Sequence, residues 1–270
     1  MILPHHIDLA QSQKYDLSIR LTPNGFSFSI FSSTNRSIFF FKDIDFNNNL
    51  SFVENVKKIF FEVNLFTQHY RKIHVTVVSP FYTLVPKQFF ETANAVDFFS
   101  FNINNNQEQV LHNQSQPDSF HLVYNLNKEL YSFLHRNLWN PTFTLFTNHL
   151  VDFFKTYRSD TTSKRCFADF HDNMITIICF DAEQLLSSNT FEVKDTFDAL
   201  YNLVNIWEKL PLNQNRDLLF LSGSLNEHTE SINILKQLIR HVEKVEINNK
   251  AQHLNYTQPL PTDILLKLCE

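Results

Sequence analysis

Apolar and polar residues alternate along residues 17–31, LSIRLTPNGFSFSIF, as a half-buried β-hairpin requires. Every second position is apolar on both sides of Asn24-Gly25, a strong signal for a two-residue turn. Residues 166–180, CFADFHDNMITIICF, have the same length and the same polar interruption. The sequence therefore predicts the same strand–turn–strand unit twice.

Each predicted hairpin is followed by a third strand, an amphipathic helix and a buried strand. In the first half the helix covers residues 49–66, where Ser51 and Glu54 have the spacing of a capping box. In the second half the helix covers residues 196–210. The other expected strands span residues 37–42, 73–78, 121–125, 142–146, 190–193, 218–221 and 245–247, and the other helices span 128–138, 148–157, 230–242 and 262–269.

The order of three strands, helix, strand, helix and strand thus occurs twice, which indicates an α/β fold with mixed sheets. We expect a duplicated molecule with a first half at residues 1–158 and a second half at residues 159–270. An insertion at about 81–120 interrupts only the first half. A short helix near 89–99 is expected there, followed by a loop or hairpin tip over 102–118 without periodicity.

This element order resembles the actin-like ATPase fold, in which two ribonuclease-H-like halves close on a nucleotide. The resemblance covers roughly residues 15–250. The strings YDLSIRL, PNGFSFSIF and TLVP and the terminal CE look like an uncharacterised bacterial family of the Bacteroidetes type. The resemblance implies this fold, in a degenerate form, and no established activity.

Actin-like ATPases carry an aspartate at the end of the first strand of each half, with a glycine two positions later. The aspartate orients metal and water, and the glycine lets the turn approach phosphate. In the first half the matching positions are Arg20 and Thr22, and an arginine cannot hold a metal ion. In the second half they are Asp169 and His171, so the carboxylate is kept but the glycine is not.

The adenosine motif of that fold resembles residues 218–232, LLFLSGSLNEHTESI. Ser222 follows the apolar run, Gly223 takes one glycine position and Ser224 replaces the other. Together with Asp169, these residues are the candidate cofactor-binding set, a relic nucleotide cleft with at most weak ATP and Mg²⁺ binding. In the alternative reading, Gly223 serves only the tight turn after the strand and Asp169 is a solvated strand residue.

Composition weakens the case for an active nucleotide site. The chain has 29 Phe but only two Gly among 270 residues, and phosphate-binding loops depend on glycine. We find no phosphate-loop or nucleophile-elbow motif and no metal-ligand spacing; His5, His6 and Asp8 are read as part of a tail. Net charge is −5 without a basic run, which argues against nucleic acid as a partner.

The N-terminus lacks the pattern of a signal peptide, and no apolar stretch reaches the length of a membrane span. Three Cys do not make a disulfide framework, and Cys166 and Cys179 would lie opposite each other if the turn is at Asp172-Asn173. We therefore expect a cytoplasmic protein with free thiols.

The expected function is that of a non-hydrolysing scaffold or regulator that binds another protein, of unknown oligomeric state. The alternatives are a nucleotide-dependent enzyme, either an ATPase or a small-molecule kinase, and a ribonuclease-H-like nuclease. Four insertion phenylalanines either face a partner or pack as a satellite core: Phe89, Phe90, Phe98 and Phe99.

Overall fold

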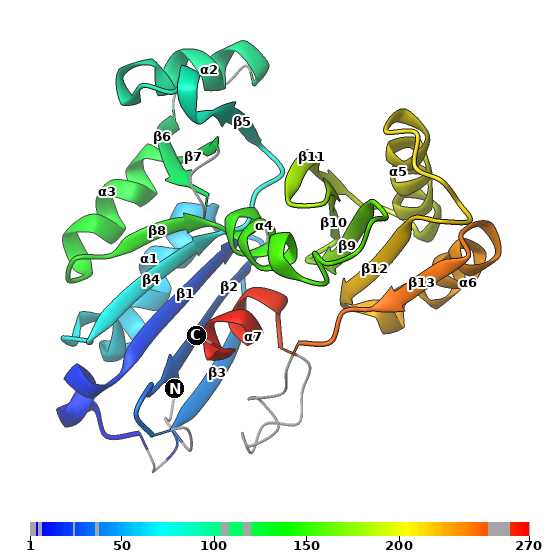
Figure 1. The fold of residues 1–270 in the computed structure, drawn as a ribbon. Helices are drawn as coiled ribbons and strands as arrows, with labels where there is room; N and C mark the ends of the chain where they lie inside the picture. Colours follow the sequence, from blue (N-terminus) through cyan, green and yellow to red (C-terminus); the bar gives the residue numbers. More distant parts are fainter. Residues whose placement is uncertain are drawn as a thin grey trace. The chain divides into compact units, whose positions relative to one another are not determined.

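The computed structural model describes residues 4, 7–23, 25–35, 38–103, 108–115, 120–247 and 260–269 (Figure 1). The readings of His5, His6 and Asn24 concern positions outside these residues. The chain divides into two compact units, the first within Met1–Asn148 and the second within His149–Asn249 and Thr257–Glu270.

Most of helix α4 (Phe146–Thr156) belongs to the second unit, where it packs on the second sheet. The ring of Phe154 on this helix stacks on Phe167 with 4.3 Å between centroids. Buried stacked rings of this kind contribute beyond the apolar area that they cover.

The first unit is built on a five-stranded sheet of order β3-β2-β1-β4-β8. β1 pairs antiparallel with β2 and parallel with β4. The strands are β1 (Asp16–Thr22), β2 (Gly25–Phe31), β3 (Phe39–Asp45), β4 (Lys72–Val77) and β8 (Thr142–Leu145), and the helices are α1 (Phe52–Glu62) and α3 (Lys128–Asn137). The capping box of Ser51 and Glu54 is present at the start of α1, as the sequence predicts.

Phenylalanine fills the core of the first unit. The rings of Phe60 and Phe66 stack at 4.4 Å, and Phe26 meets Phe66 edge to face at 5.6 Å. Phe28 and Phe133 contact the same group of rings. Much of the unusual phenylalanine content is therefore used in packing between the sheet and α1 and α3.

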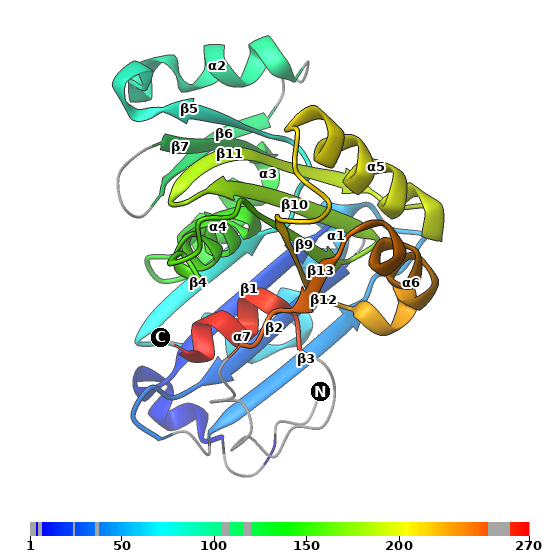
Figure 2. The ribbon, with the colours of Figure 1, turned by 45° about the vertical axis from the view of Figure 1, so that its right-hand side comes forward.

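The second unit repeats the arrangement in a sheet of order β11-β10-β9-β12-β13 (Figure 2). Its first strand again pairs antiparallel with the second and parallel with the fourth. The strands are β9 (Arg165–His171), β10 (Met174–Asp181), β11 (Gln184–Glu192), β12 (Leu218–Gly223) and β13 (His241–Lys244), and the remaining helices are α5 (Thr196–Lys209), α6 (Thr229–Leu238) and α7 (Thr262–Cys269). The two sheets thus have equivalent strand orders and strand directions.

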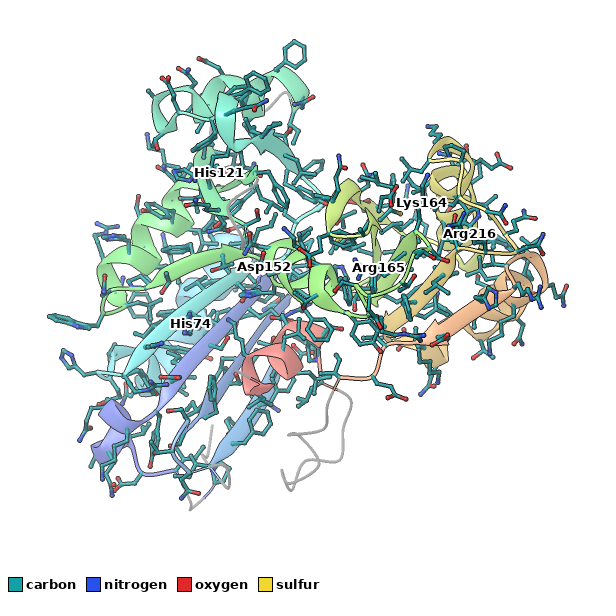
Figure 3. The ribbon with its side chains drawn as sticks, in the orientation of Figure 1. His74, His121, Asp152, Lys164, Arg165 and Arg216 are labelled. Atoms are coloured by element: carbon teal, nitrogen blue, oxygen red, sulfur yellow. The ribbon has the colours of Figure 1, made fainter. Side chains whose placement is uncertain are left out.

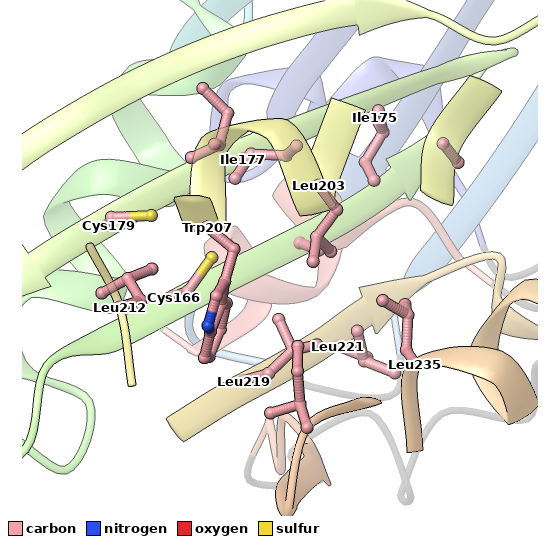
Figure 4. Close-up of a cluster of buried hydrophobic side chains, with 14 of the residues drawn as sticks. Cys166, Ile175, Ile177, Cys179, Leu203, Trp207, Leu212, Leu219, Leu221 and Leu235 are labelled. Atoms are coloured by element: carbon pink, nitrogen blue, oxygen red, sulfur yellow. The ribbon is translucent and has the colours of Figure 1, made fainter. Parts of the chain in front are cut away.

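The second hairpin turns at Asp172-Asn173, where both residues have positive φ, and this turn sets the register of β9 and β10. Cys166 and Cys179 are direct cross-strand partners and are both free and buried. They lie in the apolar cluster around Trp207 (Figure 4). Both cysteines are therefore free thiols that pack in the apolar core.

The insertion forms a three-stranded sheet of order β5-β7-β6 covered by α2. Its elements are β5 (Tyr82–Pro86), α2 (Ala95–Asn102), β6 (Glu108–Gln114) and β7 (Phe120–Asn127). Of the two expectations for residues 102–118, a loop or a hairpin tip, the loop is wrong where β6 lies, because β6 forms a hairpin with β7. This strand, EQVLHNQ, is a half-exposed edge strand, so it lacks the alternation that marks a strand in sequence.

Three other expectations are wrong. The helix expected near 89–99 begins only at Ala95, after two short 3₁₀ turns. The last strand is β13, not residues 245–247, and α6 ends at Leu238 rather than at 242. Val242 pairs with Leu219 of β12, a distant contact that local periodicity does not report.

Candidate functional site

The two sheets place Arg20 and Asp169 at matching positions. Arg20 pairs with Thr76 on β4, and Asp169 pairs with Ser222 on β12. In the same way, the antiparallel partner of Arg20 is Ser27 and that of Asp169 is Thr176. The register therefore supports the comparison of these positions that the sequence suggested.

Asp169 is fully buried, and its carboxylate is bound by the protein itself. Oδ2 accepts hydrogen bonds from Ser222 Oγ at 2.6 Å and from Thr262 Oγ1 at 2.7 Å. Oδ1 has no hydrogen-bond partner within the described part of the chain. Burial is the main cause that raises the pKa of Asp169, while His171 and the two hydroxyls act in the opposite direction.

The second donor comes from α7, the final helix. Thr262 is its first residue, and Asp263 beside it is also fully buried and raises the pKa of Asp169 further. Among the described residues, no group of three or more His, Cys, Asp or Glu side chains is placed to hold a metal ion. In this structure Asp169 is thus part of the contact between α7 and β9.

Gly223 is the last residue of β12 and pairs with Phe170 of β9. Its φ is +83°, and a Cβ at this position would lie 2.0 Å from the carbonyl oxygen of Phe170. The next N–H, that of Ser224, donates to the same carbonyl at 2.8 Å. The glycine permits a close approach of two backbones, and the neighbouring N–H, which a phosphate would need, is already used.

The first unit makes the same backbone contact without a glycine. The N–H of Val78 donates to the Leu21 carbonyl at 2.8 Å, which matches the bond from Ser224 to Phe170. This contact is therefore a shared feature of the two sheets and does not by itself indicate a ligand.

A chain of polar side chains continues from the site along β9, β10 and β11. His171 Nε2 and Thr176 Oγ1 lie 2.8 Å apart, and Thr176 Oγ1 lies 2.8 Å from Thr190 Oγ1. These hydrogen bonds span three strands and leave His171 largely buried. The sequence marks His171 only as the residue at the lost glycine position, so this network was not predicted.

Arg165 was also missed by the sequence analysis. It is fully buried and donates to four carbonyls, those of Phe154, Lys155, Tyr157 and Ala182 (Figure 3). Three of these carbonyls lie at the C-terminal end of α4, where a cation also complements the helix dipole. Desolvation lowers the pKa of Arg165.

The four insertion phenylalanines divide between the two alternatives, a satellite core and an exposed surface. Phe99 is fully buried, and Phe90 and Phe98 pack against the same small core. In contrast, Phe89 is 60% exposed and Phe101 is 90% exposed. Of the four phenylalanines singled out in the sequence, only Phe89 is largely exposed. Phe101, which the sequence did not single out, is exposed as well.

Comparison with known proteins places this geometry in context. Residues 4–242 match the family model described as protein of unknown function, DUF3822. No curated protein matches the chain. No helix among the described residues is long and apolar enough to cross a membrane.

The structure is similar to a Bacteroides thetaiotaomicron protein described as having an actin-like ATPase fold and unknown function. The two share 29% identity over 97% of this chain and 98% of the other, with a TM-score of 0.83. The PilM–PilN type IV pilus biogenesis complex matches at 12% identity over 95% of both chains, with a TM-score of 0.52.

The cytoplasmic domain of EpsL, an inner-membrane component of the Vibrio cholerae type II secretion system, matches at 9% identity. It covers 94% of both chains with a TM-score of 0.52. These likenesses confirm the expected fold class, an α/β protein with mixed sheets and the actin-like ATPase fold.

Proposed function

The chain belongs to the DUF3822 family, and from that premise we propose that it is a non-hydrolysing member of the actin-like ATPase fold. Its proposed role is that of a cytoplasmic scaffold or regulator that binds another protein. The proposal includes a common origin of the two units, because their sheets share strand order, strand direction and register around Arg20 and Asp169.

The observation that carries the proposal is the internal use of the groups that a Mg²⁺–nucleotide would need. One oxygen of Asp169 is bound by Ser222 and Thr262, and the N–H of Ser224 is bound by Phe170. The matching position in the first unit is Arg20, which repels a metal ion. These residues therefore do not fit a Mg²⁺–nucleotide, and catalysis by phosphoryl transfer is disfavoured.

A protein-binding role is supported by the insertion and by analogy. PilM occurs in a complex with PilN, and EpsL is a component of a secretion system. In this chain Phe89 and Phe101 are exposed on the insertion, and Val96 of α2 is exposed with them. Apolar side chains left in water in this way are favoured at contact surfaces between proteins.

The test compares proteins that co-purify with affinity-tagged chain from its native cells. We expect the native chain to retain a specific partner and the double variant Phe89→Ser, Phe101→Ser to lose it. Both side chains are already exposed, so the melting temperature of the variant should stay within about 2 °C of native.

The matched control is Phe61→Ser, since Phe61 is similarly exposed but lies on α1, outside the insertion. This control should retain the partner. If the double variant retains the partner, or if the control loses the partner to the same extent, the insertion is not the binding surface.

A further inference from the structure

A cavity of about 340 Å³ opens in the first unit at the start of strands β4 and β8. Residues of the segment 70–74 form one wall, and Trp139, Asn140 and Thr142 form the other. All of them belong to the first unit, whereas Asp169 and Gly223 belong to the second. The volume lies at the lower end of the range for small-molecule sites, roughly 300–1,000 Å³.

One side of the cavity offers an exposed indole. The chain has two tryptophans, and they differ sharply: Trp207 is 3% exposed in the core, whereas Trp139 is 67% exposed. Trp139 lies at the turn between α3 and β8, next to Asn140, which has a φ of +47°. The ring of His69 contacts the indole at 4.9 Å between centroids. Trp139 is thus held at the cavity with most of its surface free to stack on a planar group.

The other side of the cavity is basic. Arg71, Lys72 and His74 all line it, and no acidic residue does. His74 lies on β4 (Figure 3). Arg71 forms an ion pair with the buried carboxylate of Asp16, which positions its guanidinium. Lys72 is exposed and has no ion-pair partner within the described residues. Because Asp16 offsets the charge of Arg71 and a histidine is neutral at pH 7, Lys72 supplies the net positive charge that a bound anion would meet.

We propose that this cavity binds a small aromatic anion, a planar ring that bears a phosphate or a carboxylate. The ring stacks on Trp139, and the anionic group lies near Lys72 and Arg71. The volume admits one small molecule of this kind. Neither the expected nucleotide cleft nor the exposed insertion surface involves these residues.

The test is calorimetric titration of the full chain with phenyl phosphate and with phenylacetate, which separates the two anionic groups. Inorganic phosphate and acetate report charge without a ring, and benzyl alcohol reports a ring without charge. We expect saturable binding of at least one aromatic anion, at least tenfold tighter than any of these three controls. Binding should weaken with added salt, since charge contributes to it.

Fluorescence provides a second readout. Acrylamide should quench exposed Trp139 and spare Trp207, and the bound ligand should protect Trp139 from quenching. Trp139→Ala and Lys72→Ala should each weaken binding about tenfold or more. Lys58→Ala is the control, because Lys58 is a surface lysine on α1, away from the cavity lining, and should leave affinity unchanged.

Several results would overturn the proposal. These are no saturable binding by either aromatic anion, equal affinity for the ringless or uncharged controls, or affinity that is unchanged in Trp139→Ala. All three variants alter exposed side chains, so their melting temperatures should match native and a folding defect would not mimic the expected losses.

Discussion

Two single residues distinguish the matching strands of the two units. At matching strand positions the two units hold opposite charges, Arg20 and Asp169, and both side chains are buried. The guanidinium of Arg20 lies 5.4 Å from the ring centroid of Phe146. Asp169 instead faces two hydroxyls. Each charged side chain is thus contacted by residues of its own unit.

Asp169 makes the free energy of unfolding depend on pH. The pKa of an unfolded aspartate is about 3.9, and burial raises the value in the folded chain. Between the two values the folded state binds more protons than the unfolded state. The contribution of Asp169 to stability is therefore full below the unfolded pKa and is lost as pH rises through the folded pKa.

Replacing Asp169 by Asn should remove this loss while keeping an oxygen acceptor for Ser222 and Thr262. We expect the variant to gain stability relative to native as pH rises from 4 to 8, by about 1.4 kcal/mol for each unit of raised pKa. Urea unfolding at several pH values measures the difference. A variant that is less stable than native at every pH would show that the carboxylate itself is required.

Between elements, one carboxamide joins the insertion to the main sheet of the first unit. Asn113 on β6 donates through Nδ2 to the Phe143 carbonyl at 2.9 Å, and its Oδ1 accepts from the Leu145 N–H at 2.7 Å. The side chain thus supplies β8 with the pair of bonds that a neighbouring strand would make. This contact couples the β5-β7-β6 sheet to the end of β8.

Asn113→Ala should leave both backbone groups of β8 without these partners. We expect a loss of about 1–3 kcal/mol in the free energy of unfolding, because unsatisfied buried groups cost more than the bond itself contributes. Amide hydrogen exchange should accelerate at Leu145. Asn137→Ala is the control: it removes one bond to the Phe133 carbonyl at the end of α3 and should cost about 1 kcal/mol or less. Equal effects of the two variants would contradict the bridging role of Asn113.

Across the whole chain, glycine is scarce. The chain has two glycines; Gly25 lies in the first hairpin, and Gly223 is required by the approach of Phe170. A triphosphate is normally neutralised by a metal ion and by N–H groups in glycine-rich turns.

We therefore expect no Mg²⁺-dependent release of phosphate from ATP above the rate in buffer, measured with purified full chain at millimolar ATP. Asp169→Asn is the informative comparison, because it retains the hydrogen-bond acceptor but removes the carboxylate. Phosphate release that depends on Mg²⁺ and disappears in Asp169→Asn would establish the enzyme alternative. Gly223→Val does not serve here, since its side chain would clash with the Phe170 backbone.

Features encoded by local spacing could be predicted from the sequence alone. The two hairpins follow from period-two alternation, the turn at Asp172-Asn173 sets the pairing of Cys166 with Cys179, and the capping box starts α1. The position of Asp169 beside the adenosine-like segment was also readable, because both lie at the ends of adjacent strands. Such features need only neighbours along the chain or across one turn.

Only the tertiary structure decided the remainder, because those features depend on partners distant in sequence. β6 is a strand because β7 pairs with it, and Arg165 is buried because α4 ends above it. Thr262 reaches Asp169 across 93 positions of sequence. Phe99 and Phe101 have the same side chain two positions apart, yet the helix turns one into the core and leaves the other in water.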